Sequence, residues 1–447
     1  MATEKKLADR RHGIVSPWVF SGLFGAFLGL ALLKFGNPPI MEKFIEPPTN
    51  LTEWIIMSWP VGVGYWLLGV VAVVGLFAGH GQTGAPKWVL ALPLLWLGWQ
   101  FVSATHSVDP DLTRATLKHF VACVVCFYLG VFGLRRDQSV CALWGVIVFA
   151  LGIVLAIGLD QHFGGLADTR KYFFTYVYPQ LPTVPPEYLK KISSDRIFST
   201  LFYPNALAGV ILLLLPPATV MICQCGVRLT TAARGLLVGL FGAAALACLY
   251  WSGSKGGWLL ALLLALVALL HLPWSKRAKA IFVSAVLVAG MAGFFLKYAG
   301  FFQRGATSVS ARFDYWRAAL RTVAAKPVFG TGPGTFSIAY EAIKRPESEM
   351  SRLTHNDYLQ QASDSGLVAA VAYLAIAVTI LIHGYAKPAT PDGLGKFAVW
   401  LGLLGYALQG LMEFGLYIPA LAWTAFGVGG WLLGNGAKRF DNRLAGH

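Results

Sequence analysis

The sequence predicts an all-α polytopic membrane protein, with about twelve transmembrane helices and two long loops on one side of the membrane. Three observations predict this class. Hydrophobic residues make up 56% of the 447 residues and charged residues only 13%. Several runs of roughly twenty residues carry no charge, and basic residues gather in the short connections between runs. The bilayer is therefore the main solvent of this chain.

The apolar runs approach the length of ~20 residues that a helix needs to cross a bilayer. The first run follows a polar, basic segment. It is longer than a signal-peptide core and has no small-residue cleavage site, so we expect an uncleaved helix. We expect one membrane domain over residues 1–447, with an even number of spans and both termini on one side. The predicted spans lie near 14–33, 56–78, 88–104, 117–134, 139–159, 203–222, 232–250, 257–272, 279–299, 363–383, 396–414 and 416–435.

The placement of Lys and Arg orients these spans. Short loops rich in basic residues stay in the cytoplasm, so we expect both termini there, in a multi-pass protein of an inner membrane. The basic residues on this side are Lys5, Lys6, Arg10, Arg11, Lys87, Arg135, Arg136, Arg228, Arg234, Lys276, Arg277, Lys279, Lys387, Lys396, Lys438, Arg439 and Arg443.

The net charge of +15 would also suit a protein that binds nucleic acid. The basic residues are scattered among short loops, however, and form no single stripe. Membrane orientation and contact with anionic lipids explain the charge better, so we expect no nucleic-acid partner.

Six cysteines all lie in or beside apolar runs. A disulfide framework is therefore not expected. Cys123 and Cys126 have the spacing of a redox motif, but they lie in a predicted lipid-buried helix. Packing is the favoured interpretation for both.

Two long loops, 160–202 and 300–362, face away from the cytoplasm in this topology. Loops of this length in a compact protein usually have a function. The second contains Phe313, Trp316 and Leu320 at helical spacing, which predicts an amphipathic helix at the membrane surface.

Three arginines lie on this predicted helix. Arg312 and Arg317 are five positions apart, which separates them by about 140° around a helix of about 100° per residue. Arg312, Arg317 and Arg321 therefore cannot all line one face, and only some can reach a common ligand. Contact with lipid headgroups explains Arg317 and Arg321 equally well.

Four further polar segments lie at the same predicted boundary. The glycine-rich run 330–335 could present amides to a phosphate, but a tight turn is favoured because the P-loop lysine is missing. His355 and Asn356 precede a span, and a histidine can exchange a proton near neutral pH. Arg196 and Asn205 close the first loop. Lys255 opens a span, where it could also be a snorkelling anchor.

Metal and cofactor chemistry receives little support from the residue pattern. No spacing of His, Cys and Glu suggests zinc, and no Gly-x-Ser-x-Gly elbow is present. The Asp109-Pro110-Asp111 run precedes a predicted helix, so capping is the favoured role for Asp109 or Asp111. We expect neither a metal nor a cofactor.

Together these motifs resemble the O-antigen ligase family, within the ligase and polymerase superfamily of bacterial surface polysaccharides. The most specific is His355-Asn356, followed after nine residues by Gly366. Arg196 with the Pro-Asn pair ending at Asn205 is similar to a second family element. Ser254-Lys255-Gly256 is similar to a third, with lysine in place of arginine, which puts a bidentate phosphate contact there in doubt. Arg312 and Trp316, with the turn that follows, are similar to the stretch before the family histidine.

The resemblance implies a fold related to membrane-embedded (GT-C-like) lipid-sugar transferases and an inverting, metal-independent glycosyltransferase. It would transfer O-antigen from undecaprenyl diphosphate to lipid A-core at the periplasmic face. His355 would be the general base, with Arg312 and Arg196 on the diphosphate. Further contacts to substrate are expected from Lys255, Asn205, Asn356, Arg317 and Arg321.

Three other functions stay open at this point. A polymerase of the same superfamily would use a second lipid-linked glycan as acceptor. A protein O-oligosaccharyltransferase would share the histidine motif, but such enzymes usually extend further beyond the last helix. A transporter would place ionisable residues at the midplane of broken helices, whereas these spans are nearly free of them apart from Glu413 near a helix end.

Overall fold

The computed structural model describes ten stretches of the chain, and every regular element in them is a helix. The basic residues expected near the termini and at 135–136 lie outside these stretches. The described residues are 14–44, 47–78, 83–134, 139–180, 189, 192–226, 228–271, 274–303, 307–345 and 348–435.

Each predicted span corresponds to a helix. Among the described residues, seven helices are long and apolar enough to cross a membrane, and α4 and α12 are apolar but shorter. The chain is thus an all-helical polytopic membrane protein, as predicted. The helices at the predicted spans are α2 (Pro17–Lys34), α4 (Val61–Phe77), α5 (Lys87–Ala104), α6 (Pro110–Tyr128), α7 (Val140–Asp160), α10 (Pro204–Cys225), α11 (Thr231–Ser252), α12 (Lys255–His271), α13 (Lys276–Gln303), α16 (Asp357–Gly384), α17 (Pro391–Gln409) and α18 (Pro419–Gly434).

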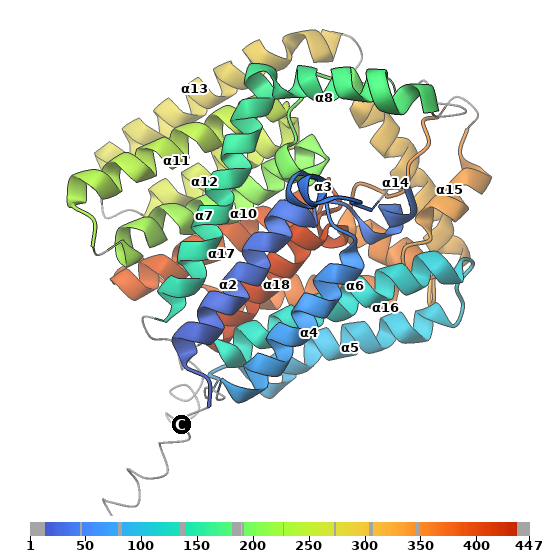
Figure 1. The fold of residues 1–447 in the computed structure, drawn as a ribbon, viewed down its shortest axis with the longest axis horizontal. Helices are drawn as coiled ribbons and strands as arrows, with labels where there is room; N and C mark the ends of the chain where they lie inside the picture. Colours follow the sequence, from blue (N-terminus) through green and yellow to red (C-terminus); the bar gives the residue numbers. More distant parts are fainter. Residues whose placement is uncertain are drawn as a thin grey trace, which may run out of the picture.

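Helix α18 forms the centre of the molecule, where it packs against α2, α6, α16 and α17 (Figure 1). Its side chains from Pro419 to Leu433 are all buried. Glycine makes this close packing possible, because a Cβ at Gly430 would overlap the carbonyl oxygen of Phe127 on α6. Helices that are apolar all round are stable only when buried in protein or lipid.

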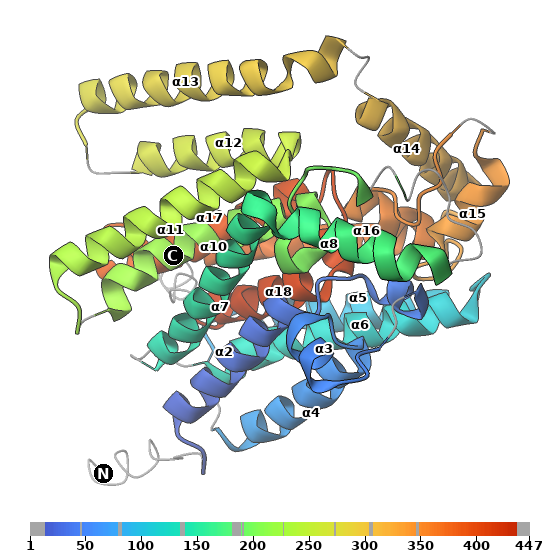
Figure 2. The same ribbon diagram turned by 45° about the horizontal axis from the view of Figure 1, so that its top comes forward.

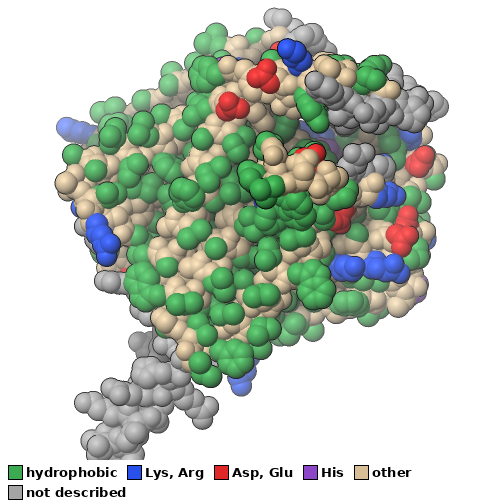
Figure 3. All heavy atoms as spheres, in the orientation of Figure 1, with side chains coloured by type: hydrophobic (Ala, Val, Ile, Leu, Met, Phe, Trp, Pro, Cys, Tyr) green, Lys and Arg blue, Asp and Glu red, His purple; other side chains and the backbone are tan. Residues whose placement is uncertain are grey.

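Helix α13 lies at the edge of the array, beyond α12 (Figure 2). Only 6% of its most apolar stretch is buried inside the protein, so lipid is the natural environment of its side chains. The face drawn in Figure 3, over α2, α4 and α7, is also covered mostly by hydrophobic side chains.

The two predicted long loops are largely helical. The first contains a π-helical turn (Gln161–Gly165) and α8 (Leu166–Tyr172), and it includes residues that the structure does not describe. The second contains α14 (Thr307–Ala325) and α15 (Phe336–Ile343), which lie at the opposite end of the molecule from the point where α10 leads into α11 (Figure 2). The predicted amphipathic helix is therefore confirmed as a helix.

Helix α16 begins before residue 362, the predicted end of the second loop. Helix α16 begins at Asp357, where Asn356 caps it through a hydrogen bond from the Leu359 N–H to its Oδ1 (2.9 Å). Hydropathy missed this first segment because it is polar, although the structure buries Gln360, Gln361 and Asp364 inside the protein.

The cysteines give one correction and one confirmation. Cys141 and Cys225 form a disulfide, although the sequence suggested no disulfide framework. They are 84 residues apart, and only the packing of α7 on α10 brings these helix ends together. Cys123 and Cys126 are buried free thiols on α6, which supports their predicted packing role.

Asp109 accepts hydrogen bonds from two amides at the start of α6, so its predicted capping role is confirmed.

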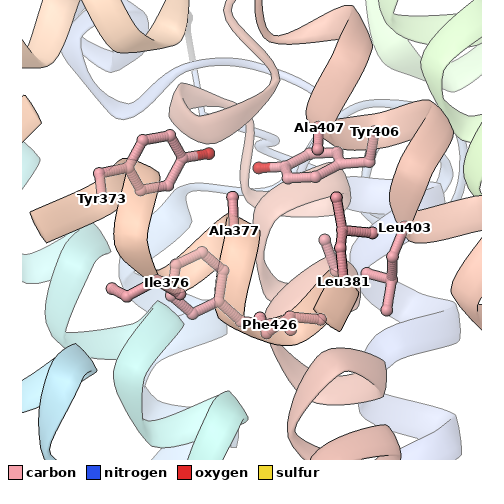
Figure 4. A pocket seen from close by; sticks show the side chains of 10 residues that line it. Tyr373, Ile376, Ala377, Leu381, Leu403, Tyr406, Ala407 and Phe426 are labelled. Atoms are coloured by element: carbon pink, nitrogen blue, oxygen red, sulfur yellow. The ribbon is translucent and has the colours of Figure 1, made fainter. Parts of the chain in front are cut away.

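A small cavity of about 30 Å³ lies between α16, α17 and α18 (Figure 4). The hydroxyl groups of Tyr373 and Tyr406 point toward each other across it, and the other labelled side chains are apolar. It contains none of the predicted site residues.

Candidate active site

His355 lies in the turn that leads into α16. Its φ of 54° is in the left-handed region, which is uncommon for residues other than glycine and costs of order 1 kcal/mol or more. Flanking hydrogen bonds hold this turn. The Thr354 N–H donates to Gln360 Oε1 (2.7 Å), and the Thr354 hydroxyl donates to the Asn356 carbonyl (2.8 Å). The histidine side chain is thus presented in a defined direction.

The imidazole of His355 lies between two aromatic rings. The Phe414 ring meets it edge-on with centroids 4.7 Å apart, and the Tyr315 ring of α14 stacks at 5.9 Å. The side chain is still 26% exposed, so a substrate can reach it.

Glu413 lies opposite His355, in the connection between α17 and the short helix η7 (Gly415–Tyr417). Two hydrogen bonds tie this connection to Asp357 at the start of α16. The Asp357 N–H donates to the Gly410 carbonyl (2.7 Å), and the Leu416 N–H donates to Asp357 Oδ2 (3.0 Å). Glu413 and His355 are therefore held on one rigid unit.

The carboxylate of Glu413 joins three predicted site residues. Its Oε2 lies 3.0 Å from His355 Nδ1. Its Oε1 accepts hydrogen bonds from Arg312 Nη2 on α14 and from Asn205 Nδ2 (2.6 Å) at the start of α10. The side chain is only 10% exposed, and a buried carboxylate needs such partners to remain charged.

Arg196 completes this network from the first loop. Its Nη2 donates to Asn205 Oδ1 (2.7 Å), and its Nε donates to the Ser252 carbonyl (2.7 Å) at the C-terminus of α11, where the helix dipole favours a cation. Burial lowers the pKa of the Arg196 guanidinium, and the nearby Glu413 carboxylate opposes that shift. Arg196, Asn205 and Glu413 form a continuous chain of hydrogen bonds.

Lys255, the first residue of α12, lies beside this network. Its ammonium is 5.1 Å from the centroid of the Tyr298 ring, and it is close enough to Arg196 and Arg312 for mutual repulsion. A snorkelling side chain would extend away from the protein, whereas Lys255 is half-buried among other cations.

The remaining predicted residues do not join the cluster. Arg317 and Arg321 are exposed on α14, and Arg317 lies 4.0 Å from Asp314. The prediction that the three arginines cannot share one face is confirmed. Asn356 uses its side-chain oxygen to cap α16.

The glycine-rich run is a tight turn, as favoured from the sequence. Its amides are occupied: the Gly332 N–H donates to the Asp364 carbonyl (2.7 Å), and the Gly334 N–H donates to Asp364 Oδ2 (2.9 Å). Gly366 has a φ of 82°, and a Cβ there would overlap the Val328 carbonyl. The turn therefore supports the start of α16 and is not a phosphate cradle.

The family comparison agrees with this geometry. Residues 240–374 match the family model described as O-antigen ligase. This part of the chain is similar to the O-antigen ligase family. No curated protein matches the sequence.

The region matched by the O-antigen ligase family model runs from α11 into α16 and contains Lys255, Arg312 and His355. Arg196, Asn205 and Glu413 lie outside it and reach the cluster through tertiary packing.

Sequence reasoning did not assign Glu413 to the site. The available signal was an ionisable residue at the end of an otherwise apolar span, which is a functional indicator in membrane proteins. Within the described residues, no group of three or more His, Cys, Asp or Glu side chains is placed to hold a metal ion. The cluster offers one imidazole, one carboxylate and three cations for chemistry.

Proposed function

We propose that the protein is a glycosyltransferase that ligates O-antigen polysaccharide, carried on undecaprenyl diphosphate, to lipid A-core oligosaccharide. The reaction would be metal-independent, with inversion at the anomeric carbon. The observation that carries this proposal is the convergence of Arg312, Arg196 with Asn205, and His355 on Glu413. It rests also on the region matched by the O-antigen ligase family model, which contains two of these residues.

The donor half of the site is defined by its charge. Arg196, Arg312 and Lys255 face a single carboxylate, so the local charge is positive and favours a diphosphate. Guanidinium groups give paired hydrogen bonds to phosphate oxygens. They can neutralise the charge that develops on the leaving diphosphate, which is the main requirement for catalysis with such a donor.

The acceptor half of the site is His355. Glu413 engages Nδ1, which leaves Nε2 as the ring nitrogen for an acceptor hydroxyl. Nε2 takes the proton of the hydroxyl as its oxygen bonds to the anomeric carbon. The bond from that carbon to the phosphate oxygen breaks, and the diphosphate leaves with the electron pair. A single displacement of this kind inverts the anomeric centre.

The surrounding residues would have supporting roles. Asn356 would position His355 by capping α16, and Arg317 and Arg321 would meet lipid headgroups or outlying substrate phosphates on the exposed face of α14. Helix α14 and the cluster lie at the end of the molecule opposite the connection from α10 to α11, where basic residues are predicted to face the cytoplasm (Figure 2). This arrangement supports a site at the periplasmic face of the bacterial inner membrane.

An acceptor comparison tests the reaction. Purified protein receives lipid-linked O-antigen together with lipid A-core, a second lipid-linked glycan or a pilin-like protein, each in a separate reaction. Product should form with lipid A-core alone. Product only with the second glycan would identify a polymerase, and product only with the protein an O-oligosaccharyltransferase.

A histidine substitution tests the base. His355→Ala should reduce transfer by about 10²- to 10⁴-fold, the usual contribution of a general base. His383→Ala, at the other end of α16, is the matched control and should transfer normally. Near wild-type transfer by folded His355→Ala would show that the base assignment is wrong.

A further inference from the structure

Glu413 is shared between the donor and acceptor halves of the site, since one carboxylate contacts both Arg312 and His355. We propose that Glu413 is a positioning residue that couples donor binding to proton transfer. It holds Arg312 before the donor binds and gives its full charge to His355 once the donor diphosphate binds Arg312 in its place. This proposal rests on the proposed function and extends it to the order of events.

The charge of Glu413 is divided among three partners. Oε1 receives two donors, Arg312 Nη2 and Asn205 Nδ2, and Oε2 faces the imidazole nitrogen. An adjacent guanidinium offsets the negative charge that the carboxylate presents to His355. Less of the carboxylate charge therefore acts on the imidazole while Arg312 is bound to Glu413.

Exposure decides which partner the donor can displace. The Arg312 side chain is 22% exposed and that of Glu413 is 10% exposed, so a ligand from solvent or lipid reaches the arginine first. A diphosphate carries more charge than a carboxylate and offers several oxygens for two-pronged hydrogen bonding. It should therefore compete for Arg312, whose helix α14 lies at the end of the molecule (Figure 2).

Glu413 stays in place when Arg312 leaves. Asn205 still donates to it, and Asn205 is held by Arg196, which is anchored on the Ser252 carbonyl. The unshared carboxylate then accepts the Nδ1 proton of His355, which keeps Nε2 unprotonated and stabilises the imidazolium that forms during transfer. The Phe414 and Tyr315 rings flank the imidazole independently of Glu413. The carboxylate therefore acts chiefly by placing negative charge beside the imidazole and by fixing which ring nitrogen carries the proton.

The substitution Glu413→Gln separates the two roles, because one role predicts tighter donor binding and the other predicts slower turnover. It frees Arg312 from its counter-ion, so the KM for the lipid-linked donor, and its Kd measured without acceptor, should fall several-fold. It also removes the charge beside His355, so kcat should fall by roughly a hundredfold or more. Glu413→Asp keeps the charge but withdraws the carboxylate, and it should show both shifts at smaller size.

The control is Glu341→Gln, on the exposed surface of α15, which should change neither constant. Thermal unfolding in detergent establishes whether each variant is folded, and Glu413→Asp carries the test if Glu413→Gln is not. An unchanged kcat, or a lower kcat with unchanged or weaker donor binding, would refute the coupling.

The Kd measurement keeps this test distinct from the test of the proposed function. If the ligase assignment fails, the wild-type protein will form product with another acceptor, or will form no product with any acceptor. Failure of the coupling would appear as the wrong direction of the Kd shift, whichever acceptor gives product.

Discussion

Arg312 and Arg321 lie on the same helix but in different surroundings. Arg312 is paired with Glu413 inside the cluster, whereas Arg321 is exposed. Lysine retains the charge of either residue but loses the two-pronged geometry, which matters only where an anion accepts two hydrogen bonds from one guanidinium. The same Arg-to-Lys substitution at the two positions therefore tests the role of Arg312, with Arg321 as the control.

We expect Arg312→Lys to lower kcat/KM by roughly 10- to 100-fold, the value of one charge-assisted hydrogen bond. Arg321→Lys should remain within about twofold of wild type, because a lipid headgroup accepts either cation. Initial rates of transfer at several donor concentrations measure both. Equal rates for wild type and Arg312→Lys would remove the diphosphate role from Arg312.

At the scale of elements, the start of α16 depends on the turn before it. The helix backbone breaks at Gly366, and the Leu367 N–H donates to the Pro327 carbonyl (2.8 Å). The residues from His355 to Gly366 thus form one helical segment with the turn before it, and the hydrogen bond to Pro327 holds its end. Gly366 touches no reacting group, yet its conformation determines where that segment ends.

Gly366→Ala should destabilise the protein by about 3 kcal/mol or more, because φ is positive and the new Cβ would overlap the Val328 carbonyl. Transfer should fall with it, since the segment carries His355. Thermal unfolding in detergent measures the change. Gly98→Ala on α5, where a Cβ meets open space, should be neutral or stabilising. A Gly366→Ala protein as stable as wild type would show that the break in α16 is dispensable.

At the scale of the whole molecule, membrane orientation places the cluster in one compartment. The expectation of a periplasmic site comes from the basic short loops, several of which lie outside the described residues. It can be tested at two exposed positions, Glu341 on α15 and Arg277 on α13, which should lie on opposite sides.

In a background whose native cysteines are replaced, a membrane-impermeant maleimide should label Glu341→Cys in cells with a permeable outer membrane. Arg277→Cys should react only after the inner membrane is broken, because a charged reagent cannot cross the hydrocarbon core. The reverse pattern would place the cluster in the cytoplasm and overturn the proposed function.

The sequence by itself determined the membrane class, the positions of the helices, the amphipathic character of α14 and the capping role of Asp109. Each of these depends on local composition or helical periodicity within one segment. It also identified His355, Arg312, Arg196 and Asn205 as site candidates, although for His355 mainly through resemblance to a family.

Only the tertiary structure showed that these residues meet at Glu413. Glu413 is 58 residues from His355, 101 from Arg312 and 208 from Asn205. No local pattern encodes such separations, because they depend on how α10, α14 and α16 pack around the α17–α18 connection. The disulfide between Cys141 and Cys225 and the early start of α16 were missed for the same reason. Buried polar groups find their partners only when the helices are assembled.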